Sequence, residues 1–148
     1  MLTAQMKKLI TDHSAGMVAS TNDNGSPSVS PKATFAIIDD TTIAFGNIRS
    51  PGTLANIRKR PAVEVCFIDV VLRKAVRASG TASIVRTADA QAKVVEAFQP
   101  NWATYMSQIS AFVVIDVSAA ELIWSPAYDL GHSEEELRHA NLQKLNAL

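Results

Sequence analysis

The spacing of apolar residues divides the first half of the chain into short elements. Leu2, Met6, Leu9 and Ile10 recur at helical spacing, which predicts an amphipathic helix over residues 2–13. Three strands are then expected at residues 17–21, 28–38 and 42–47, separated by the turn signals Asp23-Asn24-Gly25 and Asp39-Asp40. Because these connections are short, the three strands are expected to form an antiparallel meander.

Proline and capping residues set the helix boundaries in the rest of the chain. A helix is expected to begin after Ser50 and to be stopped by Pro61, which cannot continue it. A later helix over residues 88–98 follows Thr87, whose hydroxyl is expected to cap it. Ser133 opens a capping-box pattern, which predicts a helix in the tail.

The remaining apolar runs complete a strand-rich fold. Strands are expected at residues 62–68, 75–85 and 112–117, with a short further segment at 122–124. Gly80 lies inside one of these strands and indicates a bulge or a close backbone approach. Six short strands with mostly tight connections favour a mainly β (α+β) fold, a closed or nearly closed antiparallel barrel flanked by helices. With no linker or repeat, residues 1–148 are expected to form a single domain, with a helical tail at residues 126–148.

The charges are balanced overall but unevenly distributed. Fourteen basic and fourteen acidic residues give a formal net charge of zero, which argues against a dedicated nucleic-acid binder. Residues 41–63 and 70–88 each carry four basic residues and no acid, whereas the tail is acidic. Most of these basic side chains are expected on solvated surfaces, so the asymmetry favours a local anion site over a nucleic-acid face.

The sequence contains no pattern for a disulfide, a metal site, a common nucleotide-binding motif or a membrane span. Cys66 is the only cysteine, so no internal disulfide can form, and its apolar surroundings predict a buried, inert thiol. The histidines, His13, His132 and His139, lack a metal-ligand pattern, and no metal site is expected. Neither a dinucleotide-binding glycine motif nor a P-loop is present. Without a signal peptide or a membrane-length apolar run, a cytoplasmic protein with no membrane partner is expected.

The clearest candidate site is the start of the helix after Ser50. Pro51 suits the first helical position, and Gly52 lets backbone approach a ligand closely. Thr53 adds a hydroxyl in the first turn, and Arg49 stands just before the helix. Free amide groups and the helix dipole favour a bound anion, so this segment predicts a phosphate site.

A second candidate segment is Ser30-Pro31-Lys32, at the start of the strand over residues 28–38. Proline in a strand indicates an edge or a bulge, where backbone groups are free to meet a ligand. In an antiparallel meander this segment would face Asn47, Ile48 and Arg49 at the end of the next strand. The alternative is that Lys32 is an edge-strand lysine that discourages aggregation.

These two segments belong to a longer run, GMVASTNDNGSPSVSPKATFAIIDDTTIAFGNIRSPGTLANIRKRPAVEVCF. Over residues 2–125 the chain resembles the pyridoxamine 5′-phosphate oxidase-related family of small FMN-binding proteins. The likeness rests on the strand-turn-strand opening, the S-P-K stretch and the T-L-A-N-I-R helix that ends in proline. It implies a six-stranded antiparallel split β-barrel with flanking helices, and a homodimer with two FMN sites at the subunit interface.

The resemblance also implies which residues contact the cofactor. They are Ser30, Pro31, Lys32, Ala33, Asn47, Arg49, Ser50, Thr53 and Trp124. Ser50 and Thr53 match the phosphate-binding helix start, and Arg49 matches the basic or polar position before it. The segment 30–33 matches the strand along the isoalloxazine ring, and Asn47 the end of the adjoining strand. Trp124 resembles an aromatic residue that some members contribute across the dimer.

The chain departs from the true oxidases at two places. It has PKATFA where they carry a basic, aliphatic R-x-V-L-L-K type run, and its short tail is acidic at residues 134–136. An acidic tail would repel a second phosphorylated ligand, so pyridoxamine phosphate oxidation itself is not expected. Trp102 and Tyr105 are interpreted either as lining a substrate pocket or as packing in the core or dimer.

The function expected from these residues is that of an FMN-binding oxidoreductase. It would pass electrons or hydride between a reductant and a small-molecule acceptor, neither of which the sequence identifies. No residue is indicated as an acid-base catalyst. Two alternatives stay open: a non-catalytic flavin-binding or sensing module, and the same fold with a deazaflavin cofactor.

Overall fold

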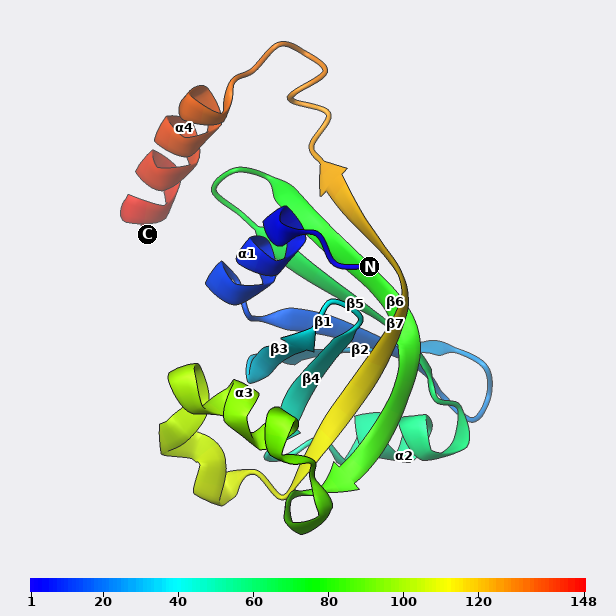
Figure 1. The fold of residues 1–148 in the computed structure, drawn as a ribbon. Helices are drawn as coiled ribbons and strands as arrows, with labels where there is room; N and C mark the ends of the chain where they lie inside the picture. The colour runs from blue at the N-terminus through cyan, green and yellow to red at the C-terminus, as the bar shows by residue number, and fades with distance from the viewer.

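The computed structural model describes residues 1–148, in which a curved antiparallel sheet is surrounded by four α-helices (Figure 1). The seven strands lie in the order β2-β1-β5-β6-β7-β4-β3. They are β1 (Gly16–Thr21), β2 (Pro27–Lys32), β3 (Phe35–Asp39), β4 (Thr42–Asn47), β5 (Ala62–Asp69), β6 (Lys74–Arg86) and β7 (Ala111–Trp124). The helices are α1 (Ala4–Asp12), α2 (Pro51–Lys59), α3 (Ala92–Trp102) and α4 (Glu134–Asn146), with short 3₁₀ turns η1 (Thr87–Asp89) and η2 (Ala103–Gln108).

The sheet is a split barrel because its two edge strands are neighbours in the chain. β2 and β3 occupy opposite edges of the sheet, yet only Ala33 and Thr34 separate them. The sheet must therefore curl until its edges approach each other. The mainly β barrel expected from the sequence is confirmed, with seven strands instead of six.

The extra strand arises where the sequence predicted one continuous strand over residues 28–38. That prediction is wrong, because the chain changes partners at Ala33 and Thr34. β2 pairs with β1, from Gly16–Lys32 to Thr21–Pro27, whereas β3 pairs with β4, from Phe35–Phe45 onward. A hydrogen bond from Phe35 N to Ala33 O (2.9 Å), between residues two positions apart, closes the bend between β2 and β3.

Two apolar clusters fill the two sides of the sheet. The larger cluster of nineteen residues lies inside the barrel and includes Phe45, Phe67 and Val65, all fully buried. α1 and α2 add their apolar faces to it. A smaller cluster lies under α3, where Phe98 packs on Phe112 with ring centroids 4.7 Å apart. β4 is buried on both faces because it lies between the two clusters.

Other boundaries differ from the predicted ones in identifiable ways. Residues 112–117 and 122–124 belong to one strand, β7, which pairs with β6 along its length. Thr87 does not cap a helix; its hydroxyl donates to Ile109 O (2.7 Å), and η1 precedes α3. The capping box at Ser133 is confirmed, as is the bulge at Gly80, where the β6–β7 register shifts. No helix in the chain is both long enough and apolar enough to cross a membrane.

Candidate functional site

The start of α2 presents backbone donors that the chain leaves unused. Ser50 is the N-cap and Pro51 the first helical residue, as predicted, and the first helical bond runs from Leu54 N to Ser50 O (3.0 Å). The amides of Gly52 and Thr53 precede that bond and donate to no acceptor in the chain. Two N–H groups at the positive end of the helix dipole are therefore available to an anion.

Two hydroxyl groups stand beside these amides. Ser50 and Thr53 are only 8% and 6% exposed. The Ser50 hydroxyl makes no capping bond to the helix, and Thr53 Oγ1 has no hydrogen-bond partner in the chain. A side chain added at Gly52 would meet nothing within 4 Å, so the space over this turn is open. The start of α2 thus presents two unused amides and two unused hydroxyls, with open space over Gly52.

An unpaired cation stands just before the N-terminal end of α2. Arg49 is exposed and forms no ion pair, whereas Lys59 and Arg60 at the other end both bind Asp23, at 2.8 and 2.6 Å. The hydrogen bond from Lys59, with that from Arg60, holds the pKa of the Asp23 carboxyl below its usual range. The uncompensated cation before the helix therefore favours an anion there.

Buried contacts hold α2 in place against the barrel. Asn56 donates through Nδ2 to Ser20 Oγ (3.1 Å) and to Asn22 Oδ1 (3.0 Å), which joins the helix to β1 and its turn. Leu54 and Ile57 contribute to the barrel core. Because these hydrogen bonds and apolar contacts hold the helix against the barrel, the amides of its first turn have a defined position.

Asn47 connects the end of β4 to the start of β7. Its Nδ2 donates to Ser110 Oγ (3.1 Å), and Ser110 N donates to Asn47 O (3.0 Å). Asn47 Oδ1 is the one fully buried side-chain polar atom in the chain without a partner. Thr34 Oγ1 donates to Gly46 O (2.7 Å), so the β2–β3 bend lies beside the end of β4.

The segment Ser30-Pro31-Lys32 does not pair with the end of β4, contrary to the prediction. Its residues pair with β1, where Ser30 is opposite Val18 and Lys32 is opposite Gly16. Within the segment 30–33, which was predicted to line the flavin ring, only Ala33 is adjacent in the chain to Thr34, the residue that contacts Gly46. Lys32 Nζ donates to Ser30 Oγ (2.6 Å), and partial burial lowers the pKa of the Lys32 ammonium.

Trp124 lies at the opposite end of the barrel from α2. It ends β7 opposite Lys74, whereas the start of β7, Ala111, pairs with Asn47. Thirteen residue steps at about 3.3 Å each separate the two ends by roughly 40 Å along the strand. Figure 1 shows β7 as a long, curved ribbon. One chain therefore brings Asn47, Arg49, Ser50 and Thr53 together, but not Trp124.

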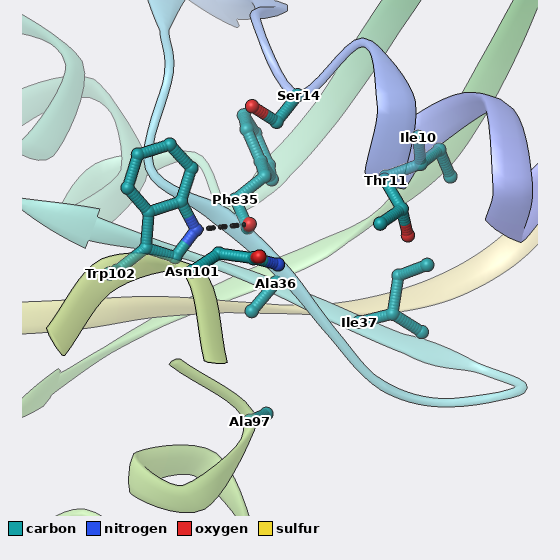
Figure 2. A pocket seen from close by; sticks show the side chains of 9 residues that line it. All are labelled: Ile10, Thr11, Ser14, Phe35, Ala36, Ile37, Ala97, Asn101 and Trp102. Carbon is teal, nitrogen blue, oxygen red and sulfur yellow. Dashed lines mark hydrogen bonds between the residues drawn. The ribbon is translucent and has the colours of Figure 1, made fainter. Parts of the chain in front are cut away.

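A separate cavity of about 330 Å³ lies between α1, β3 and α3 (Figure 2). Trp102 forms one wall, and its indole Nε1 donates to Phe35 O (2.8 Å) on the free edge of β3. Tyr105 does not line this cavity; its ring is 6.2 Å from that of Trp102 and 46% exposed. Trp102 therefore lines a cavity and packs on the barrel edge, and a role toward a substrate stays a prediction.

Sequence reasoning missed the residues that position the site from a distance. Ser110 and Thr34 fix Asn47 and Gly46, and Asn56 fixes α2, through contacts between elements far apart in the chain. No local pattern marks these residues. The polar Asn56 on the buried face of an amphipathic helix was the one available signal.

Comparisons with known proteins agree with this fold. The family described as pyridoxamine 5′-phosphate oxidase matches residues 2–123. HupZ from Group A Streptococcus is 27% identical with a TM-score of 0.71, covering 84% of this chain and 96% of that one. An FMN-binding protein from Syntrophomonas wolfei is 10% identical with a TM-score of 0.65, covering 80% and 84% of the two chains.

An F420 reductase is 18% identical with a TM-score of 0.57, covering 72% of this chain and 88% of that one. At their levels of identity, this reductase and the Syntrophomonas protein share the fold alone. No curated protein sequence matches the chain.

Proposed function

Because the chain belongs to the pyridoxamine 5′-phosphate oxidase family, we propose that it binds FMN and acts as an oxidoreductase. Bound flavin supplies electron or hydride transfer between a reductant and a small acceptor. The chain's own residues bind and orient the cofactor. The pair of unused amides at Gly52 and Thr53 is the observation that carries this proposal.

The start of α2 is proposed to hold the phosphate of FMN. The Gly52 and Thr53 amides and the Ser50 and Thr53 hydroxyls are donors with no competing partner in the chain. Arg49 adds a cation that no carboxylate neutralises. A dianionic phosphate matches this donor set, since charge-assisted hydrogen bonds are stronger than neutral ones.

The remainder of the FMN site is proposed to need a second copy of the chain. Trp124 lies at the far end of β7 from α2, so only a partner's Trp124 can reach the cofactor. The outer face of the sheet carries exposed apolar side chains that suit such a contact. They are Met17, Val29, Ile68 and Ile123, which the strand registers place on one face. The segment 30–33 would then line the ring side of the site.

Two other functions fit the same fold. A deazaflavin could replace FMN, as the similar fold of an F420 reductase suggests, and its absorption spectrum differs from that of a flavin. A flavin-binding module without turnover would bind FMN equally well. Steady-state oxidation of a nicotinamide cofactor with an added acceptor separates an enzyme from such a module.

Differential binding of FMN and riboflavin tests the phosphate site. Thr53→Val and Arg49→Ala each remove a phosphate contact, so each is expected to weaken FMN about tenfold or more while leaving riboflavin nearly unchanged. Calorimetry or quenching of flavin fluorescence measures both affinities. Arg58→Ala is the matched control, because Arg58 is exposed in the last turn of the same helix.

Equal weakening of FMN and riboflavin would show that these residues do not touch the phosphate. The cofactor itself is tested on the purified protein. With free FMN about a hundredfold above its Kd, the free energy of unfolding should rise by about 2.7 kcal/mol. A colourless protein whose melting temperature does not respond to FMN would overturn the proposal.

A further inference from the structure

A second polar cleft lies between the two ends of the chain. α1, the turn between β5 and β6, and α4 enclose a volume of about 510 Å³. None of its lining residues belongs to the proposed FMN site. In Figure 1, α4 lies beside α1, on the side of the barrel away from α2. The volume is within the range of small-molecule sites, about 300–1,000 Å³.

Lys74 places a buried cation in this cleft. The residue is only 6% exposed, and its Nζ lies 4.0 Å from the centre of the Trp124 ring. Within the chain, Nζ donates to a single acceptor, a carboxylate oxygen of Glu134 from the tail helix. An ammonium group has three N–H donors, so Lys74 keeps two that are not used.

The acids of the cleft, in contrast, are already engaged. Asp69 accepts from Val71 N and Leu72 N through one oxygen, both at 2.9 Å, and its other oxygen lies 3.3 Å from His13 Nε2. Asp12 accepts from Lys8 at 2.6 Å. Glu134 binds Lys74, as described above. Each of these carboxylates therefore already has a partner within the chain.

Arg138 supplies the remaining unused donors. It lines the cleft from α4, is exposed, and forms no ion pair or hydrogen bond within the chain. A guanidinium group carries five N–H donors in a fork that matches a carboxylate or a phosphate. Leu9, Leu72 and Leu142 add apolar lining nearby. The cleft therefore offers unused N–H donors at Lys74 and Arg138, and apolar surface at the leucines.

From this imbalance, we propose that the cleft binds a small organic anion with an apolar portion. The anionic group, a carboxylate or a phosphate, would contact Lys74 and Arg138, and the apolar portion would lie against the leucines. When no ligand is bound, the Glu134 carboxylate occupies the place beside Lys74 that the anionic group would take. This proposal does not depend on flavin binding.

Titration of the purified protein with benzoate, benzamide and inorganic phosphate tests the proposal. Benzoate should bind saturably and shift the amide signals of Val71 and Leu72 and the indole signal of Trp124 in ¹H–¹⁵N spectra. Benzamide has the same ring without the charge and should bind about tenfold more weakly or worse. Phosphate binding stronger than that of benzoate would assign the site to phosphorylated ligands; binding of neither anion would overturn the proposal.

Variants identify the groups that bind the anion. Arg138→Gln should weaken benzoate about tenfold, and Glu134→Gln should strengthen it because the internal competitor loses its charge. Arg86→Gln is the matched control, since the Arg86 side chain is 80% exposed and lies outside the cleft. Lys74→Met should abolish binding; if it does not fold, Arg138→Gln decides, because that side chain is exposed. Benzoate affinity unchanged in Arg138→Gln would refute the proposed site.

Discussion

At the scale of single residues, two glycines serve opposite purposes. A Cβ at Gly80 would collide with the main-chain carbonyl of Asp116 and lie 2.9 Å from the Ile115 side chain, so glycine allows β6 and β7 to approach at their bulge. A Cβ at Gly52 would meet nothing. The first glycine is therefore required by the barrel, and the second leaves room over the proposed phosphate site.

Alanine at each glycine separates these two roles. Gly80→Ala is expected to lower the free energy of unfolding by about 1–3 kcal/mol, because backbone must move to admit the methyl group. Gly52→Ala should leave it unchanged or raise it by up to about 1 kcal/mol, since alanine favours a helix. Gly52→Ala should nevertheless weaken FMN binding. Urea unfolding measures both energies, and a destabilised Gly52→Ala variant would contradict the open space seen there.

At the scale of elements, the sequence predictions are correct where the signal lies in neighbouring residues and wrong where it depends on distant ones. The helix stop at Pro61 and the capping box at Ser133 depend on residues a few positions apart, and both were predicted correctly. The break at Ala33 and Thr34 was missed, because it depends on which strand each half meets. Thr87 was misread for the same reason, since its hydroxyl is used by a distant carbonyl.

The same distinction applies to the candidate site. The donors at the start of α2 could be predicted, because a proline and a glycine after Ser50 mark a helix start. The position of Lys32 could not, because it depends on pairing with β1. Local patterns thus predict the phosphate end of the proposed site, whereas strand partners decide the ring end.

Asp39 links three elements and predicts an effect of pH on stability. It accepts hydrogen bonds from Thr41 N (3.0 Å) and from Lys93 of α3 (3.3 Å) at the β3–β4 turn. Chiefly because of the Thr41 amide, the pKa of Asp39 falls to about 2. A folded-state pKa below the unfolded one contributes stability above about pH 4, which is lost as the pH falls through about 2.

Asp39→Asn is therefore expected to be less stable than the natural chain at about pH 7, with the difference shrinking toward about pH 2. Urea unfolding at several pH values measures it. Asp129→Asn is a suitable control, because Asp129 is exposed and forms no ion pair. A difference independent of pH would show that the ionised carboxylate is not the cause.

At the scale of the whole molecule, the residues proposed for the FMN site lie at opposite ends of one chain, with Trp124 at one end and the start of α2 at the other. The proposed twofold-symmetric dimer would resolve this separation, because each copy would offer its Trp124 to the other's α2. The exposed apolar face of the sheet is the surface that such a dimer would cover. Assembly and cofactor binding are thus expected to depend on the same residues.

Light scattering tests this dependence. The natural protein should have about twice the chain mass of 15.9 kDa. Met17→Glu combined with Ile68→Glu places charges on the outer sheet face and should give monomers that also bind FMN about tenfold more weakly. Leu130→Glu, at an 80% exposed position in the tail, is the control. A monomeric variant with unchanged FMN affinity would show that cofactor binding does not depend on the dimer.

The bend at Ala33 and Thr34 also bears on aggregation. Exposed strand edges are where folded proteins most easily recruit other chains. Here the bend joins the two edges of the sheet, and the edge strand β2 contains Pro27 and Pro31, which have no N–H group to offer. The chain therefore presents little continuous edge to an intruding strand, and the proposed association through the face of the sheet would not grow into open-ended assemblies.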